Sequence, residues 1–316
     1  MIAGRIVQPR HLQVPLQRSA FVLQSSLPNT GSARLVRPLS VFSARQNVAP
    51  SNATPAPPAK SQALDPRWLT MIKRRIGRCM MFGLKPHQVQ EAGHILQQLA
   101  TDWRELIAGS EGFLTDETRR GLFRHNVVWG EMDVMVSYCR HVNNVTYVRY
   151  AETARINFMR NYAIHIDPAH KKEWMNMVGS TGIGLILRSI KVDYKFPMKW
   201  PDKITVYHKL VHDPSSPSLP DKAAFELHVI ILSEARQRPA ARCHEDIVTY
   251  DYRVAQKTPL PPFIMEQFKK TWALQEEAKA TWRRRIQDIE SKVRTLELES
   301  WDREDAVEDM GSAARK

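Results

Sequence analysis

The segment 141–155 constrains the fold of this chain more than any other, because a polar turn leads there directly into an amphipathic helix. The turn contains Asn143 and Asn144, and asparagine favours the position at which a helix begins. Apolar and aromatic residues then recur at helical spacing: Tyr147, Val148, Ala151, Ala154, Phe158 and Tyr162. The sequence therefore predicts a long helix that starts at this turn and packs one face against a sheet.

Runs of alternating residues on both sides of this helix predict strands. A β-branched and aromatic run at 123–129 precedes it, and a half-buried strand follows Gly182 with Ile186, Arg188, Ile190, Val192, Tyr194 and Phe196 on one face. Three more strand-like runs lie at 204–211, 224–232 and 246–254. One strand, one long helix and four successive strands predict an α+β fold, in which an antiparallel sheet wraps around a single helix.

Helical patterns flank this core. Apolar residues recur every three or four positions from Pro86 to Leu106, and they alternate by three and four over most of 265–296, where Gln275 is an interruption. The second pattern fits either a coiled-coil contact or a helix folded back along its own domain. We expect a leader and Pro-rich linker at 1–60, a helical extension at 61–122, the α+β domain at 123–258 and a C-terminal helical extension at 259–316.

The net charge of +13 is concentrated at the start of the chain. Residues 1–60 hold seven Lys and Arg and no acidic residue, spaced among Ser, Gln, Leu and Val. This composition is typical of a mitochondrial transit peptide, and a basic disordered tail is the alternative interpretation. We expect import into the mitochondrial matrix. The rest of the chain carries a smaller excess of basic over acidic residues, which argues against nucleic acid as the partner.

Other classes of protein are excluded by what the sequence lacks. No run approaches the roughly 18 consecutive apolar residues of a membrane-spanning helix, so we expect no membrane span. Cys79, Cys139 and Cys243 are scattered without a CxxC pair. We therefore expect neither a disulfide framework nor a metal site.

Two parts of the sequence together resemble a known family. Trp-Gly-Glu-Met-Asp at 129–133 and the run at 141–155 are similar in order and spacing to the 4-hydroxybenzoyl-CoA thioesterase-like branch of the hot-dog family. Glu131 stands where the family has the first of two Asp residues. Four extra residues precede the helix, and Arg140 occupies the position of a glycine. The resemblance implies a hot-dog fold, and the helical patterns at both ends add helical extensions to it.

The resemblance also assigns catalytic roles. Asp133 matches the carboxylate that acts as nucleophile or general base on a thioester carbonyl, and its other interpretation is a turn residue. Asn144 matches the position whose backbone amide polarises the thioester oxygen at the positive end of the helix. Glu152 is a second candidate base, with an ion pair to Arg155 as the alternative. The four extra residues, at Val136–Cys139, either displace Asp133 or bulge outward between fixed ends.

Three more residues are candidates for binding substrate. They are His141, Asn143 and Tyr147, and each has a structural alternative: a polar residue at a helix start, an N-cap and a core residue. No cofactor is expected except the coenzyme A carried by the substrate. Its phosphates have six possible partners, between which the sequence does not choose: Arg188, Lys191, Lys195, Arg236, Arg238 and Arg242.

Two functions follow from these observations. The first is hydrolysis of an acyl-CoA (or acyl-carrier) thioester by a mitochondrial homodimer, or tetramer, whose subunits join by edge strands, as the resemblance implies. The second is a hot-dog subunit without catalysis that acts as a binding or scaffold protein in a mitochondrial assembly. Fold alone does not separate the two.

Overall fold

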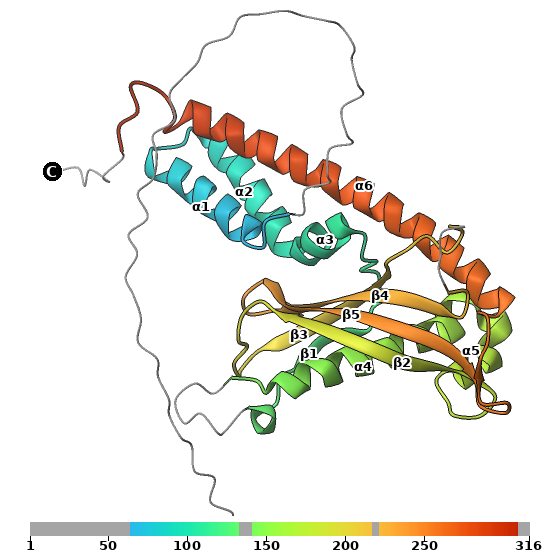
Figure 1. Cartoon of the computed structure of the whole chain (residues 1–316). Helices are drawn as coiled ribbons and strands as arrows, with labels where there is room; N and C mark the ends of the chain where they lie inside the picture. Colours follow the sequence, from blue (N-terminus) through green and yellow to red (C-terminus); the bar gives the residue numbers. More distant parts are fainter. Residues whose placement is uncertain (1–63, 133–140, 217–220, 309–316) are drawn as a thin grey trace, which may run out of the picture. The chain divides into compact units, whose positions relative to one another are not determined.

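An antiparallel sheet wraps around helix α4 (Asn144–Asn161) in the computed structural model (Figure 1). Its five main strands run in the order β1-β3-β4-β5-β2, and the short β6 pairs with β5. The strands are β1 (Leu122–Asn126), β2 (Ile183–Tyr194), β3 (Lys203–Leu210), β4 (Ala224–Ser233), β5 (Arg238–Asp251) and β6 (Gln256–Lys257). The α+β fold expected from the sequence is confirmed.

The structure describes residues 64–132, 141–216 and 221–308. The leader at 1–60, Asp133 and Val136–Cys139 therefore lie outside the described residues. By their contacts, the described residues all belong to one compact unit. Within the described part, no helix is long and apolar enough to cross a bilayer.

Alternate residues of each central strand belong to two different cores, as the two faces of a sheet require. Val206 and Val229 pack in one buried cluster with Tyr147 and Ala151 of α4. Their neighbours along the strands, Tyr207 and Ile230, belong to a second cluster with the flanking helices. The sheet thus separates α4 from those helices (Figure 1).

The C-terminal helix α6 (Pro262–Glu299) folds back along its own chain. Its second half shares the outer cluster with α1 (Trp68–Met81), α2 (Pro86–Thr101) and α3 (Trp103–Ala108), through Ile286, Ile289, Val293 and Leu296. This packing decides between the two interpretations of its apolar pattern. At Gly109 the approach is so close that an added Cβ atom would collide with the Trp282 side chain.

The first half of α6 packs at the far end of α4. Ile264 and Phe268 are buried in a third cluster with Phe158 and with α5 (Lys171–Met177). Gln275, which interrupts the apolar pattern, is 3% exposed. Its side chain accepts a hydrogen bond from Leu210 N (2.9 Å) and donates one to Leu210 O (3.2 Å). The polar residue within the apolar pattern of α6 therefore satisfies the backbone hydrogen-bonding groups at the end of β3.

Several boundaries differ from the expectation. β1 ends at Asn126, and Trp129–Glu131 form a 3₁₀ turn, η2. β5 begins at Arg238, well before the expected position 246. The remaining short elements are η1 (Gly109–Glu111), η3 (Tyr162–Ile166) and η4 (Pro168–His170).

Strand β2 contains a bulge that the alternating pattern does not reveal. The register against β5 shifts between Leu187 and Ser189, so Ile186 and Ile190 lie on opposite faces of the sheet. Ile190 packs towards α4, whereas Ile186 pairs with Val248 on the other face. The prediction that both share a face was wrong, because a bulge inverts the alternation along one strand.

Candidate active site at the start of helix α4

A cavity of about 350 Å³ lies at the N-terminus of α4. Its lining combines three of the residues singled out in the sequence, His141, Asn144 and Tyr147, with the end of β2 and the residues that follow it. The latter are Tyr194, Lys195, Phe196 and Pro197. The turn and the strand end are far apart in sequence, so only the folded sheet brings them to one place.

Asn143 is the N-cap of α4. Its backbone is extended (φ −58°, ψ 138°), and its side-chain oxygen accepts a hydrogen bond from Val145 N at 3.0 Å. Asn144 is the first helical residue, and within the described residues its backbone N–H has no acceptor. The first turn carries no acidic side chain that would neutralise the positive end of the helix dipole. A free amide donor therefore points out at the start of α4.

Two tyrosines hold the end of β2 against this helix start. The Tyr194 hydroxyl donates to the Asn144 carbonyl oxygen (3.1 Å), and the Tyr147 hydroxyl accepts from Met198 N (3.0 Å). Their rings meet edge to face, with centroids 5.2 Å apart. Burial raises the pKa of both phenols, so both hydroxyls stay protonated at neutral pH. Tyr147 is buried and forms a rigid wall of the cavity.

Glu131 ties the upstream turn to α4. Its carboxylate accepts hydrogen bonds from the Tyr150 hydroxyl (2.5 Å) and from Val128 N (3.0 Å), and its carbonyl oxygen accepts from Asn143 N (2.9 Å). Burial, followed by the bond to this carboxylate, raises the pKa of Tyr150. The residue that replaces the family's first Asp is thus engaged in holding the N-cap.

The two sides of the extra residues are paired. Met132 and Val142 form an antiparallel bridge, and His141 forms another with Lys199. Asp133 itself lies outside the described residues, as does Val136–Cys139. The bridges fix the chain on both sides of the insert, so the residue before Asp133 stays next to the residue that precedes the N-cap.

Glu152 lies on the exposed side of α4 and does not line this cavity. Arg155 points instead to the sheet, where it donates to Glu245 at 2.6 Å. The Glu245 side chain is fully buried, and its other carboxylate oxygen is 3.6 Å from His208 Nε2. The alternative of a Glu152 ion pair with Arg155 was therefore wrong, because the partner of Arg155 comes from β5.

The central part of the chain is similar to a known protein family. Residues 127–268 match the model of the thioesterase-like superfamily. This part of the chain is similar to that superfamily. The match supports thioester hydrolysis as the general class of reaction, and it covers α4 and all strands except β1. The N-terminal helices lie outside it.

Several solved structures are similar to the thioesterase-like domain. A thioesterase complexed with coenzyme A and Zn from Thermus thermophilus is 20% identical, with a TM-score of 0.36 over 52% of this chain and 98% of that one. A putative thioesterase from Pseudomonas aeruginosa is 21% identical, with a TM-score of 0.34 over 45% and 93%. DHNA-CoA thioesterase from Staphylococcus aureus is 17% identical, with a TM-score of 0.36 over 48% and 90%. No curated protein sequence matches.

A larger cavity of about 910 Å³ adjoins the site and shares His141, Phe196 and Pro197 with it. We call it the basic cavity, because its lining includes Lys199, Arg236 and Arg238. Trp200 also lines it, with 49% of the residue exposed. Neither Lys199 nor Trp200 is among the residues predicted from the sequence to bind substrate. The prolines that interrupt the sequence after β2 were the only signal that this segment leaves the sheet.

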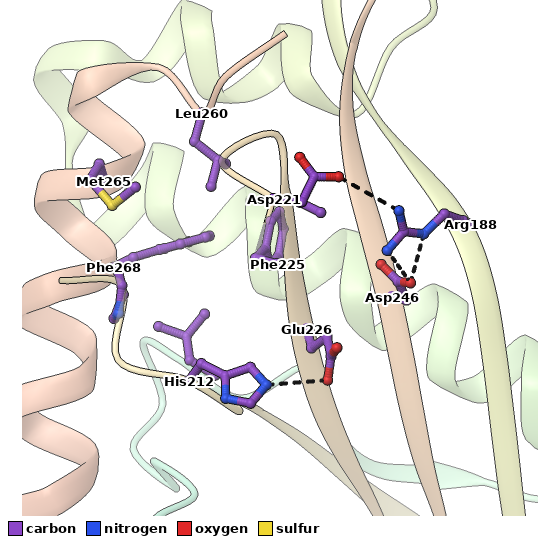
Figure 2. Close-up of a pocket in the computed structure, with 12 residues that line it drawn as sticks. Arg188, His212, Asp221, Phe225, Glu226, Asp246, Leu260, Met265 and Phe268 are labelled. Carbon is purple, nitrogen blue, oxygen red and sulfur yellow. Dashed lines mark hydrogen bonds and ion pairs between the residues drawn. The ribbon is translucent and has the colours of Figure 1, made fainter. Parts of the chain in front are cut away.

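A third cavity, of about 100 Å³, lies at the opposite end of the thioesterase-like domain. Figure 2 shows the residues that line it. It is lined by the last residue of β3 and the first of β4, whereas the basic cavity is lined by residues just before β3 and just after β4. Its floor is apolar, and at its rim Arg188 forms ion pairs with Asp246 (2.5 Å) and Asp221 (3.7 Å). None of the predicted catalytic residues lines it, and Arg188 is the residue in its lining that was a candidate for the coenzyme A phosphates.

Among the residues described, no group of three or more His, Cys, Asp and Glu is arranged to hold a metal ion. Cys79 and Cys243 are buried and free, and burial raises the pKa of Cys243 to about 12. A thiol with so high a pKa is not a nucleophile at neutral pH. Neither cysteine lines the candidate site.

Proposed function

We infer that the chain hydrolyses acyl-CoA, or acyl-carrier, thioesters to a free acid and a thiol. One observation carries this inference: the unpaired amide of Asn144 stands at the positive end of α4 and at the wall of a cavity, in a thioesterase-like domain. A thioester carbonyl oxygen placed at that amide becomes an oxyanion when the carbonyl is attacked. A donor fixed in advance stabilises this charge more than that of the ground state.

The attacking group in this proposal is Asp133, directly or through a water molecule. Attack on the carbonyl carbon gives a tetrahedral oxyanion at Asn144 N–H, and its collapse breaks the carbon–sulfur bond and expels the thiolate. If water attacks, Asp133 accepts a proton from the water and passes it to the thiolate, and the free acid is released. If Asp133 attacks, the acyl group remains on Asp133 as a mixed anhydride, which water then cleaves to the free acid, restoring the carboxylate and supplying the proton that the thiolate takes up. Support comes from the Met132–Val142 bridge, which holds the residue next to Asp133 close to the start of α4. Glu152, exposed on α4, remains a prediction for a second carboxylate.

His141 and Tyr147 shape the cavity in this proposal, and Asn143 contributes by capping the helix. His141 lines both this cavity and the basic cavity, so it lies beside the path between them. Tyr147 keeps the carbonyl site rigid, because its hydroxyl is bonded to the backbone of Met198. A substrate therefore meets a preorganised helix start.

We expect a homodimer, formed through strand β2. This strand is at the edge of the sheet, and its residues Ile190 and Val192, with Phe196 just beyond it, are only partly buried although they face α4. A long strand with an open edge and partly exposed apolar residues favours pairing with a second copy. Sedimentation velocity measures the mass in solution, and a monomer at micromolar concentration would contradict this expectation.

The acid-free composition of residues 1–60 supports import into mitochondria, where the matrix would be the place of action. Import of the chain fused to a fluorescent protein tests this point. Retention outside mitochondria in intact cells would contradict it.

The activity is tested by following thiol release from short, long and aromatic acyl-CoA substrates with the purified full chain. We expect release from at least one class, and a large loss of release in Asn144→Pro, which removes the amide of the site. No release from any substrate by a folded dimer would favour the alternative, a binding or scaffold subunit without catalysis. A pull-down from mitochondria that finds only self-association would count against that alternative.

A further inference from the structure

Six cations are candidates from the sequence for binding the coenzyme A phosphates, and they differ in whether an acidic residue already pairs with them. Arg188 is held by Asp246 and Asp221, as Figure 2 shows, and Arg242 forms two hydrogen bonds of 2.6 Å with Glu111. Both guanidinium groups are therefore already neutralised. Lys191 is exposed on β2 and lines none of the cavities at the site. The remaining candidates, Lys195, Arg236 and Arg238, all lie at the two adjoining cavities near α4.

The basic cavity keeps its positive charge unpaired. Among the described residues, Lys199, Arg236 and Arg238 have no carboxylate partner, and the Arg238 guanidinium lies 4.2 Å from the centre of the Phe196 ring. The acid in the lining, Asp202, is saturated by other donors, since its carboxylate accepts from Ser233 Oγ (2.5 Å) and from backbone N–H groups. The lining thus carries an excess of positive charge, with three cations and one carboxylate that forms no ion pair with them.

The N-terminal extension contributes one residue to the lining of the basic cavity. Thr70, in the first turn of α1, lines it and is exposed. Lys73 Nζ donates to the side chain of Gln237 at 2.6 Å, which joins α1 to the turn between β4 and β5. That turn carries Arg236, and Arg238 begins β5. Helix α1 therefore stands outside the family match yet positions the cations of the cavity.

We propose that the basic cavity binds the nucleotide end of coenzyme A, with Thr70 of α1 in its lining. The proposal rests on the proposed function and deepens it. Arg236, Arg238 and Lys199 pair with the 3′-phosphate and the diphosphate, and the exposed indole of Trp200 offers a face for the adenine. The pantetheine arm then passes His141, Phe196 and Pro197 and brings the thioester to Asn144.

The residues that line the cavity favour free coenzyme A over an acyl carrier protein as the ligand. A carrier protein brings one phosphate on a pantetheine arm and remains outside, whereas the nucleotide of coenzyme A brings several phosphates and a purine. The basic cavity, of about 910 Å³, has in its lining an exposed indole and three cations without a carboxylate partner among the described residues. These groups match the phosphates and the purine of coenzyme A. The carrier protein is thus the alternative outcome of the test.

The decisive experiment titrates adenosine 3′,5′-bisphosphate, the nucleotide end of coenzyme A, into the full chain by calorimetry. The first pair of variants is Thr70→Glu and Thr70→Gln, which differ only in charge. Position 70 is exposed in the first turn of α1, where an acidic residue is compatible with the helix dipole. We expect Thr70→Glu to weaken binding about tenfold and Thr70→Gln to leave it close to the wild-type value.

A second pair tests the cations. Arg236→Glu combined with Arg238→Glu is expected to weaken binding by roughly a hundredfold, because two attractive charges become repulsive. The matched control is Lys222→Glu, an exposed cation that precedes β4 at the other end of the sheet. It changes the net charge of the chain without approaching the basic cavity, so binding should stay within about twofold.

These measurements do not depend on hydrolysis. If the chain hydrolyses no thioester, nucleotide binding and its weakening in Thr70→Glu are still expected. Absence of nucleotide binding, or equal binding by Thr70→Glu and Thr70→Gln, would overturn the proposal even in an active enzyme. Hydrolysis of carrier-protein thioesters that weakens in the Arg236 and Arg238 variant, without nucleotide binding, would assign the cavity to a carrier protein instead.

Discussion

Met132 pairs with Val142 across the residues that interrupt the family pattern. The pairing places the residues on the two sides of the insert next to each other, and Glu131 and Asn143 are joined by a further backbone hydrogen bond of 2.9 Å. The helix start therefore keeps its place beside the upstream turn. Extra residues there do not require the flanks to move apart.

The amide of Asn144 can be removed without breaking the helix. Asn144→Pro deletes the N–H, and proline is favoured at the first helical position, where the N–H has no intrahelical partner. The residue before it already has an extended backbone (φ −58°, ψ 138°), as a proline requires. We expect kcat for acyl-CoA to fall by about 10²–10³, with far-UV circular dichroism unchanged.

Asn144→Ala is the matched control for that variant, because it keeps the amide and removes the side chain. Its kcat should stay within about threefold of the wild-type value, since the oxyanion donor is retained. Equal activity of the proline and alanine variants would show that this amide does not stabilise the transition state.

The two acids of the turn should behave differently. Asp133→Asn removes the proposed nucleophile or base and is expected to lower kcat by at least about tenfold. Glu131→Gln keeps an oxygen acceptor for the Tyr150 hydroxyl and Val128 N, so it should change stability more than turnover. Turnover with acyl-CoA and thermal melting of both variants distinguish the roles, and an active Asp133→Asn chain would remove Asp133 from the mechanism.

The buried pair of Arg155 and Glu245 should hold α4 on the sheet. Arg155→Met leaves the fully buried Glu245 carboxylate without its partner, which costs about 3–5 kcal/mol in the free energy of unfolding. Arg155→Met combined with Glu245→Leu removes both charges and should be less destabilising than the first change alone. Urea unfolding of these two variants and of Glu245→Leu alone measures the coupling, and simple additivity of the two single changes would contradict a coupled pair.

His228 should make the fold sensitive to mild acid. Its pKa is lowered from 6.5 to about 4, first by burial and then by the neighbouring His244 and the cations Lys209 and Arg242. A folded-state pKa below the unfolded one means that protonation favours unfolding. The stability that neutral His228 contributes is complete above about pH 6.5 and is lost as the pH falls towards 4.

His228→Gln should therefore flatten the fall in melting temperature between about pH 7 and about pH 5, because the variant cannot take up that proton. His165→Gln, which removes an exposed histidine from η3, is the control. Identical pH profiles of the wild-type chain and His228→Gln would show that other groups govern the acid sensitivity.

Local patterns predicted the elements of the fold more accurately than their boundaries. The helix at 144–161 and the succession of strands along the chain followed from periodicity. The bulge between Leu187 and Ser189 did not, because a single extra residue inverts the alternation without changing the composition of the strand. Arg155 was assigned to a neighbour on its own helix. Its partner, Glu245, comes from a strand that lies beside α4 only in the folded chain.

The sequence by itself determined the helix, its capping asparagines and the strands, because these depend on residues close together along the chain. It also placed the candidate site at the start of the helix. The tertiary structure alone decided which cations stay unpaired, that Tyr194 and Phe196 complete the site, and that α6 folds back on its own chain. Those relationships join segments distant in sequence, and they exist only where the sheet and helices pack together.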